Sequence, residues 1–242
     1  MSSNKNLTIS LIIPAHNEEK FIGICLESIK RWGAKFDEII VVDNASTDRT
    51  CEVAEKFSDV RVVYEERKGM TRARQRGFDE SKSDLIAYTD ADTMMPAGWL
   101  EKALKIMREN PDVVCLSGPG RYYDIPKWQQ FFESLYWTFL AIPVYYIVGY
   151  MVYGAHFVIR REVLVKMGGF DTNIEFYGED TNIARRASKF GKVLFKRSFV
   201  IDASGRRVMK QGLIRMALQY VINFVAEAFF HKPITKKYKD YR

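Results

Sequence analysis

The alternation of strand-like and helix-like segments in the first half of the chain most constrains its fold. Short apolar runs bounded by polar residues alternate with segments in which apolar side chains recur every three or four residues. Four successive strand–helix units predict an α/β fold with a mostly parallel central sheet flanked by helices. The predicted strands are 7–13, 38–42, 59–64, 85–88 and 113–116, and the predicted helices are 18–32, 47–57, 70–81 and 97–110.

Polar residues gather directly after four of these strands, within 14–19, 43–48, 65–69 and 90–93. In open α/β sheets, ligands bind beyond the carboxyl ends of the strands, so we expect one site built from four loops. The second half of the chain lacks this alternation. There the sequence predicts strands at 155–160, 192–195 and 199–202, a helix at 178–190 and a long helix at 209–230.

Asp90 and Asp92 stand where the predicted strand 85–88 ends. Residues two apart in an extended chain point to the same face, so the two carboxylates repel each other unless a cation lies between them. A hard divalent cation that carries phosphate oxygens is the natural candidate, and this is one way to hold a nucleoside diphosphate. A solvated turn would use the same residues, so the pair alone leaves both interpretations open.

Two further motifs fit an anionic nucleotide ligand. Asp43 ends a predicted strand, where its carboxylate can accept hydrogen bonds from a base or ribose, and Ser46 or Thr47 can cap the next helix. The stretch from Lys68 to Arg74 places cations near a helix N-terminus, which suits a diphosphate. A plain helix start and a solvated basic face are the alternatives.

The net charge of +7 favours anionic partners such as nucleotides and phospholipid headgroups. Nucleic acid is not expected, because no base-reading motif is present and the basic residues are spread along the chain. The three cysteines have no metal-ligand spacing and are interpreted as reduced packing residues in a reducing compartment. The polar stretch 1–6 does not resemble a signal peptide, so a cytoplasmic location is expected.

Six motifs, in this order, resemble the family 2 glycosyltransferases over residues 7–205. The resemblance implies a GT-A (Rossmann-like) fold, a nucleotide-sugar donor and an inverting transfer. The motifs are Ile13-Pro-Ala-His-Asn-Glu18, Val42-Asp-Asn-Ala-Ser-Thr-Asp48, Lys68-Gly69 through Ala73-Arg74, Asp90-Ala-Asp-Thr93, Gly168-Gly-Phe-Asp171 and Tyr177-Gly-Glu-Asp180.

The resemblance also implies roles for single residues. Asp92 would be the principal protein ligand of Mg²⁺ or Mn²⁺, Asp180 would be the general base, and Asp43 would hold uracil or guanine with its ribose. The family often has an aromatic residue at the position of His16. The residues implied to line the nucleotide-sugar pocket are Pro14, His16, Asn17, Glu18, Asp43, Arg74, Asp90, Ala91 and Glu179.

Arg206 and Arg207 lie where many family members carry a basic segment that closes over the diphosphate. The family's usual Arg/Gln-x-x-Arg-Trp pattern is absent here, and a role at a membrane surface is the alternative.

A membrane contact is predicted from two segments. Residues 134–159 contain no Asp, Glu, Lys or Arg, but a single span would separate Asp90 and Asp92 from Asp180. The aromatic-rich part, 128–153, interrupted by Pro143, is therefore predicted to be a helical pair lying in one leaflet. The helix 209–230, with its narrow polar stripe, and the basic residues after it suit anionic lipid.

The expected organisation is a catalytic domain over 1–205 with the aromatic insertion, followed by an amphipathic helix and basic tail over 206–242. The resemblance implies an inverting glycosyltransferase with a UDP- or GDP-sugar donor. Its acceptor hydroxyl would belong to a lipid-linked or membrane-associated saccharide of envelope polysaccharide or glycolipid synthesis, at the cytoplasmic face of the membrane. The alternatives are a polyprenyl-phosphate glycosyltransferase, a non-catalytic nucleotide-sugar-binding membrane protein and a nucleotidyltransferase. For the apolar segments, the alternative is packing within the protein or a homo-oligomeric interface.

Overall fold

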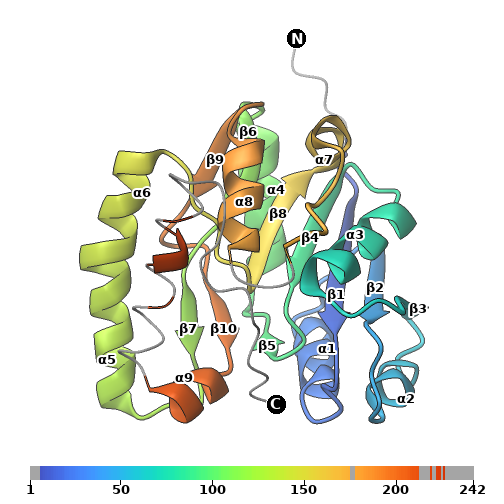
Figure 1. Cartoon of the computed structure of the whole chain (residues 1–242). Coiled ribbons are helices and arrows are strands. Elements are labelled where there is room, and N and C mark those ends of the chain that lie inside the picture. The colour runs from blue at the N-terminus through green and yellow to red at the C-terminus, as the bar shows by residue number, and fades with distance from the viewer. Residues whose placement is uncertain (1–5, 175–177, 213–218, 220–221, 225, 227–242) are drawn as a thin grey trace.

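The computed structural model describes residues 6–174, 178–212, 219, 222–224 and 226. A seven-stranded sheet in the order β3-β2-β1-β4-β8-β6-β9 forms its centre (Figure 1). Within it, β8 runs antiparallel to both of its neighbours, and the other described pairings are parallel. The predicted α/β fold with a mostly parallel sheet is confirmed. The strands are β1 (Ile9–Ala15), β2 (Glu38–Asp43), β3 (Val60–Tyr64), β4 (Leu85–Thr89), β6 (Val113–Ser117), β8 (His156–Arg160) and β9 (Lys192–Phe195).

Helices cover both faces of this sheet because successive side chains of each strand point to opposite sides. Leu11 packs in one core cluster with residues of α1 and α4, and Ile12 packs in another with residues of α3, α7 and α8. The helices are α1 (Ile22–Arg31), α2 (Thr50–Ala54), α3 (Met70–Glu80), α4 (Trp99–Glu109), α7 (Arg161–Met167), α8 (Glu179–Ala187) and α9 (Arg206–Gln211).

Strand β1 extends beyond its predicted end at residue 13 and includes Pro14 and Ala15. Its pairing with β2 continues to Ala15, whereas its pairing with β4 ends at Ile12. Pro14, which is buried, therefore lies where β1 has a partner on one side, and a proline is tolerated there because fewer ladder hydrogen bonds are required.

A second, three-stranded sheet was not predicted. It consists of β5 (Thr93–Met94), β10 (Ile201–Ala203) and β7 (Gly120–Tyr122), with β10 in the middle. Strand β5 follows Asp92 directly, so this sheet brings the chain around residue 205 close to the carboxyl end of β4.

The aromatic segment forms one continuous helix over Lys127–Val148, which we call the aromatic helix. It comprises α5 (Lys127–Tyr136), a π-helical stretch η1 (Trp137–Ala141) and α6 (Ile142–Val148). The predicted helical pair is wrong, because Pro143 stands in the first turn of α6 after the π-helical stretch and does not break the helix. By length and composition alone, this helix could cross a membrane.

Helix α9 ends at Gln211 and is followed by Gly212, whose φ is 85°, so the predicted helix 209–230 is interrupted there. Gly212 adopts this left-handed conformation without the steric cost that a Cβ brings. Most of the predicted helix beyond this point, and all of the basic tail 231–242, lie outside the described residues.

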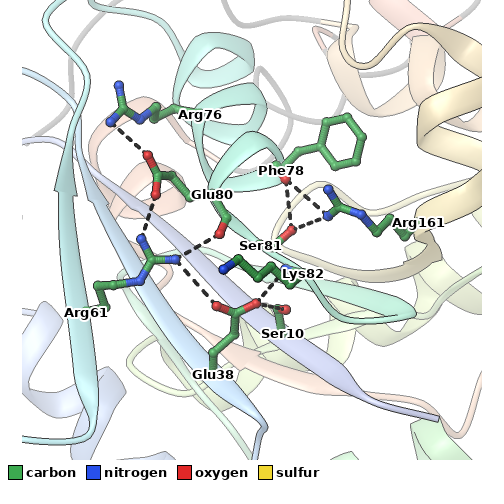
Figure 2. A network of polar contacts seen from close by, with 9 residues as sticks. All are labelled: Ser10, Glu38, Arg61, Arg76, Phe78, Glu80, Ser81, Lys82 and Arg161. Atoms are coloured by element: carbon green, nitrogen blue, oxygen red, sulfur yellow. Dashed lines mark hydrogen bonds and ion pairs between the residues drawn. The ribbon is translucent and has the colours of Figure 1, made fainter.

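A polar network joins the amino ends of the strands, at the opposite end of the sheet from the predicted site (Figure 2). Glu38 accepts hydrogen bonds from Ser10 Oγ at 2.5 Å and from the backbone N–H of Lys82 at 2.8 Å. Arg61 contacts Glu80 at 2.6 Å. These contacts fasten β1, β2 and β3 to the end of α3, and so they help to hold the frame that carries the site.

Candidate functional site

The loops after β1 and β2 are locked together by hydrogen bonds. His16 Nδ1 lies 2.7 Å from the carbonyl oxygen of Asn44, and because a carbonyl only accepts, Nδ1 carries the proton. Asn17 has a φ of 53° and accepts a hydrogen bond from the Thr47 N–H at 2.8 Å. Its own N–H donates to Ser46 Oγ at 3.0 Å. These predicted pocket residues therefore lie on one fixed double loop.

Helix α2 does not use the predicted capping residues. Ser46 and Thr47 bond to the β1 loop, whereas Asp48 Oδ1 accepts from the Thr50 N–H at 3.0 Å and from the Thr50 hydroxyl at 2.5 Å. The expectation for Ser46 or Thr47 is wrong because the neighbouring loop supplies partners that the local sequence does not reveal.

Asp43 is the last residue of β2 and is buried, and its Oδ1 accepts a hydrogen bond from the Ser46 N–H at 3.2 Å. Asn44 joins this loop to a third one, because its side chain accepts from the Gly69 N–H at 2.7 Å and donates to the Arg67 carbonyl at 2.9 Å. Asn44 is part of the matched motif, but the sequence alone gave it no structural role.

Arg206 lies directly against two of the predicted carboxylates. Its guanidinium contacts Asp92 Oδ2 at 2.9 Å and makes a bidentate pair with Glu18 at 2.6 and 2.7 Å. It also lies 4.7 Å above the ring of Phe21. Glu18 is buried, as is Ala91 beside Asp92. The start of α9 therefore meets the carboxyl ends of β1 and β4.

The two strand-end aspartates differ in their electrostatic surroundings. Burial raises the pKa of Asp92 to about 6, an effect that the charge of Arg206 opposes. Burial also raises the pKa of Asp90, and here Arg74 supplies the largest opposing charge. Arg207 is half-buried, and its charge lowers the pKa of both aspartates. Each of these partly buried carboxylates therefore has an arginine as its main neighbouring positive charge, Arg206 for Asp92 and Arg74 for Asp90.

Arg74 links the strand-end aspartates to α8. Its side chain is only 1% exposed, and its Nη2 donates to the Gly154 carbonyl at 2.8 Å and lies 3.6 Å from Asp90 Oδ1. Its Nη1 lies 3.4 Å from Glu179 Oε1, and the guanidinium lies 5.5 Å from the centre of the Phe157 ring. Arg74 is therefore held on four sides.

Glu179 and Asp180 form the first turn of α8, after Gly178 with a φ of 84°. Asp180 is not the N-cap residue, and its Oδ1 accepts from the Thr181 N–H at 2.7 Å. Burial raises the pKa of Asp180 and raises that of Glu179 to about 8. A carboxylate with a raised pKa is a stronger base than one in water, so Asp180 is suited to accept a proton.

The loop that carries Arg206 is held by a residue that sequence analysis did not identify. Asp124 Oδ2 accepts from the Ser204 hydroxyl at 2.6 Å, and its Oδ1 accepts from the Gly205 N–H at 2.5 Å. A Cβ on Gly205 would lie 2.1 Å from Ile125 Cγ2, so only glycine allows this close approach. A lone aspartate between a short strand, β7, and the helix that begins at Lys127 gives no sequence signal of this contact.

Among the described residues, no group of three or more His, Cys, Asp and Glu side chains is placed to hold a metal ion. In proteins, Mg²⁺ is commonly held by one or two carboxylates together with phosphate oxygens and water. Asp92, and Asp90 with its buried Oδ1 that has no hydrogen-bond partner, supply carboxylates of this kind.

Comparisons with known proteins identify the family and the fold. The Streptococcus pneumoniae glycosyltransferase GlyG is 31% identical over 122 residues, which is 48% of this chain and 39% of GlyG. The glucosyl-dolichyl phosphate glucuronosyltransferase of Haloferax volcanii is 23% identical over 183 residues, 69% of this chain and 57% of that protein. This chain thus spans less than two thirds of these curated relatives.

The fold is shared with the mannosyltransferase PcManGT from Pyrobaculum calidifontis, solved in complex with GDP-Man and Mn²⁺. The TM-score is 0.71 and the identity 22%, over 94% of this chain and 64% of that one. The predicted GT-A fold is thereby confirmed. A family model for glycosyl transferase family 2 matches residues 10–168, which include both strand-end aspartates and Arg74, and the chain belongs to that family.

Proposed function

We propose that this protein transfers a sugar from a nucleotide-sugar donor to an acceptor hydroxyl, with inversion at the sugar carbon. The observation that carries the proposal is the position of Arg74 between two sets of carboxylates. Its guanidinium lies 3.6 Å from Asp90 and 3.4 Å from Glu179, the residue before Asp180. Arg74 therefore lies between the strand end that suits the donor, at Asp90, and the start of α8, where Asp180 could deprotonate the acceptor.

The donor would lie across the loops at the carboxyl ends of β1, β2 and β4. Asp43 would hold the base and ribose, with His16 and Asn17 on the same double loop. Asp43 is compatible with a uracil or a guanine, so UDP- and GDP-sugars are the donors to test. The diphosphate would lie near Asp92, where Arg206 and Arg207 supply positive charge.

Asp92, with Asp90, would hold Mg²⁺ or Mn²⁺. Such an ion, when bound, supplies positive charge that stabilises the leaving diphosphate. Asp180 would take the proton of the acceptor hydroxyl while the hydroxyl oxygen forms its bond to the sugar carbon. The bond from that carbon to the diphosphate oxygen breaks, and the electron pair leaves with the nucleotide. Attack from the side opposite the diphosphate inverts the carbon.

The acceptor we propose is a lipid-linked or membrane-associated saccharide at the cytoplasmic face of the membrane. The name of the Haloferax volcanii relative describes a sugar already attached to dolichyl phosphate. A polyprenyl phosphate is the second candidate acceptor. It is an anion already, and the position of Asp180 in the first turn of α8 favours the hydroxyl because only a hydroxyl must lose a proton.

Thermal-shift measurements with UDP and GDP, each with and without Mn²⁺, test the donor site. We expect one nucleotide to raise the melting temperature in a Mn²⁺-dependent way, and Asp92→Asn to abolish the shift. Asp59→Asn is the matched control, since Asp59 pairs with Lys30 at 2.8 Å, just before β3, and is about half exposed. No shift with either nucleotide, or an unchanged shift in Asp92→Asn, would contradict the proposed donor site.

A further inference from the structure

One side of the aromatic helix is exposed and almost entirely apolar. We call its large exposed side chains the aromatic face, and Figure 1 shows the helix, α5 to α6, at one edge of the molecule. Several of these side chains are more exposed than most surface apolar residues, with Phe139 at 73%, Tyr146 at 77% and Ile147 at 83%. The aromatic face consists of Trp128, Phe131, Phe132, Phe139, Leu140, Tyr146 and Ile147.

The opposite side of the same helix is fastened to the catalytic domain. The ring of Trp137 stacks on Phe195 of β9 at 5.6 Å, and the Tyr145 hydroxyl donates to the Val193 carbonyl at 3.3 Å. Glu133 is buried and accepts from the backbone N–H of Tyr122 at 3.1 Å. Lipid therefore cannot surround this helix unless these contacts are broken.

Both ends of the helix also return to the same domain. Strand β7 precedes it and pairs with β10, while Tyr153, soon after it, pairs with His156 at the start of β8. A helix crossing a bilayer would carry these two attachments to opposite sides of the membrane. The geometry therefore allows the helix to lie flat on a membrane surface but does not allow it to span the bilayer.

Charge along the helix selects the kind of surface. Between residues 127 and 148 the charged residues are Lys127, at the first position, and Glu133, which is turned inward. Beside the helix, Arg197 contacts the Thr138 hydroxyl at 3.2 Å, and the neighbouring Lys196 is exposed. Aromatic side chains prefer the membrane–water interface, and cations beside them favour anionic headgroups.

We propose that the aromatic face docks on a bilayer surface that contains anionic phospholipid, with the helix axis in the plane of the membrane. The docking does not depend on the proposed sugar transfer, but its consequence for the acceptor does.

The chain that leaves the helix reaches Gly154, where an added Cβ would lie 3.6 Å from that of Asp180. The negative charge of Asp180 also contributes to the raised pKa of Tyr136 in α5. A docked enzyme would therefore hold its base close to the lipid surface, where a glycolipid presents its hydroxyl.

Flotation of the full chain with vesicles tests the docking. We expect binding to phosphatidylcholine vesicles that contain phosphatidylglycerol, and a loss of about tenfold or more in the double variant Phe139→Ser, Ile147→Ser, because two large apolar side chains no longer leave water. The matched control is Ile24→Ser, Val165→Ser, which changes two exposed apolar residues of α1 and α7 and should bind like wild type. Equal binding by both double variants would overturn the proposal.

Depth and self-association provide the remaining tests. Trp128 fluorescence, obtained by subtracting a Trp128→Phe variant, should be quenched most by lipids brominated near the headgroup. Strongest quenching by bromine at the bilayer centre would indicate a span and overturn the flat orientation.

A dimer in solution that dissociates in the Phe139→Ser, Ile147→Ser variant would make the face a protein interface instead. The nucleotide thermal shift of this variant should match wild type, so a failed donor site and a failed membrane contact give different results.

Discussion

Two arginines pair with carboxylates in the same site, and they are held very differently. Arg74 lies in the eleven-residue helix α3 with its side chain 1% exposed, between Asp90 and Glu179. Arg206 lies at the start of the six-residue helix α9 with its side chain 19% exposed, against Glu18 and Asp92.

The difference separates a permanent cation from an exchangeable one. Removing Arg74 would leave carboxylates buried without their partner, which is costly in a medium of low polarity. Arg206 is closer to solvent and can leave the partly exposed Asp92 for water or for a diphosphate at a smaller cost, while its other partner, Glu18, is buried. On the proposed function, Arg74 would maintain the frame of the site, while Arg206 would give way to the donor and its cation.

The largest expected effects distinguish Asp180, the proposed base for the acceptor, from Asp92, the proposed metal ligand on the donor side. Asp180→Asn should lower the rate of sugar transfer by about 10²–10⁴-fold, the usual contribution of a general base, while nucleotide binding stays near wild type. Asp92→Asn should lose the Mn²⁺-dependent binding itself. Initial rates with a radiolabelled donor and the thermal shift measure the two effects. Near-normal transfer by Asp180→Asn would exclude it as the base.

The arginines themselves should differ in their effect on folding. Arg74→Met should lower the free energy of unfolding by about 3–5 kcal/mol, the cost of breaking a buried ion pair. Arg206→Met should lower it less, by roughly 1–3 kcal/mol, because Arg206 is closer to solvent although its bidentate partner Glu18 is buried. Urea denaturation of both variants measures the difference. Equal losses would refute the distinction between a permanent and an exchangeable cation.

The meeting of the strand ends that would hold the donor could be predicted largely from sequence. Apolar runs followed directly by polar residues locate the ends of β2 and β4, and the rules for parallel sheets bring Asp43, Asp90 and Asp92 to one edge. The family resemblance supplied the remaining roles. Asp180 and Arg74, which lie far apart in the chain, could be joined only through that resemblance.

After Ser117, the predicted strands 155–160 and 192–195 and the predicted helix 178–190 match β8, β9 and α8, but the small sheet and the path of the aromatic helix could not be predicted, because they depend on contacts between distant residues. Strands β7 and β10 have three residues each, too few to show a periodic pattern. Asp124 has its role only because the chain near residue 205 packs beside it. The helix through Pro143 is continuous because a π-helical stretch precedes the proline, and no simple sequence rule indicates that.

The carboxylates compared above pair with Arg74 or Arg206. The buried carboxylate of Glu133 instead accepts a hydrogen bond from the backbone N–H of Tyr122. Burial raises its pKa from 4.5 to about 7, so between these values the folded protein holds a proton that the unfolded chain has released. The contribution of Glu133 to the free energy of unfolding is therefore fully present below about pH 4.5 and is lost as the pH rises through 7.

Glu133→Gln removes this titration. Its stability relative to wild type should rise by on the order of 1–3 kcal/mol between pH 5 and pH 8. Thermal or urea unfolding at several pH values measures this, and the difference between the two proteins cancels the other carboxylates. Glu162→Gln is the control, because that side chain is 66% exposed. A wild-type-minus-variant difference that does not change with pH would contradict the assignment.

The smallest effect tests the exchange of cations directly. Arg206 contacts Asp92 at 2.9 Å, so its charge opposes the approach of a free metal ion to that carboxylate. Without nucleotide, Arg206→Gln should therefore bind Mn²⁺ about fivefold more tightly, equivalent to ~1 kcal/mol, which is the scale of a partly solvated ion pair. With nucleotide present the sign should reverse, because the variant has lost a positive charge near the diphosphate. Mn²⁺ binding followed by electron paramagnetic resonance reports both values without turnover.

Arg121→Gln is the matched control, since Arg121 pairs with Asp202 at 2.6 Å on the small sheet. Weaker Mn²⁺ binding by Arg206→Gln in both conditions would mean that this arginine supports the metal site and does not give way to the ion.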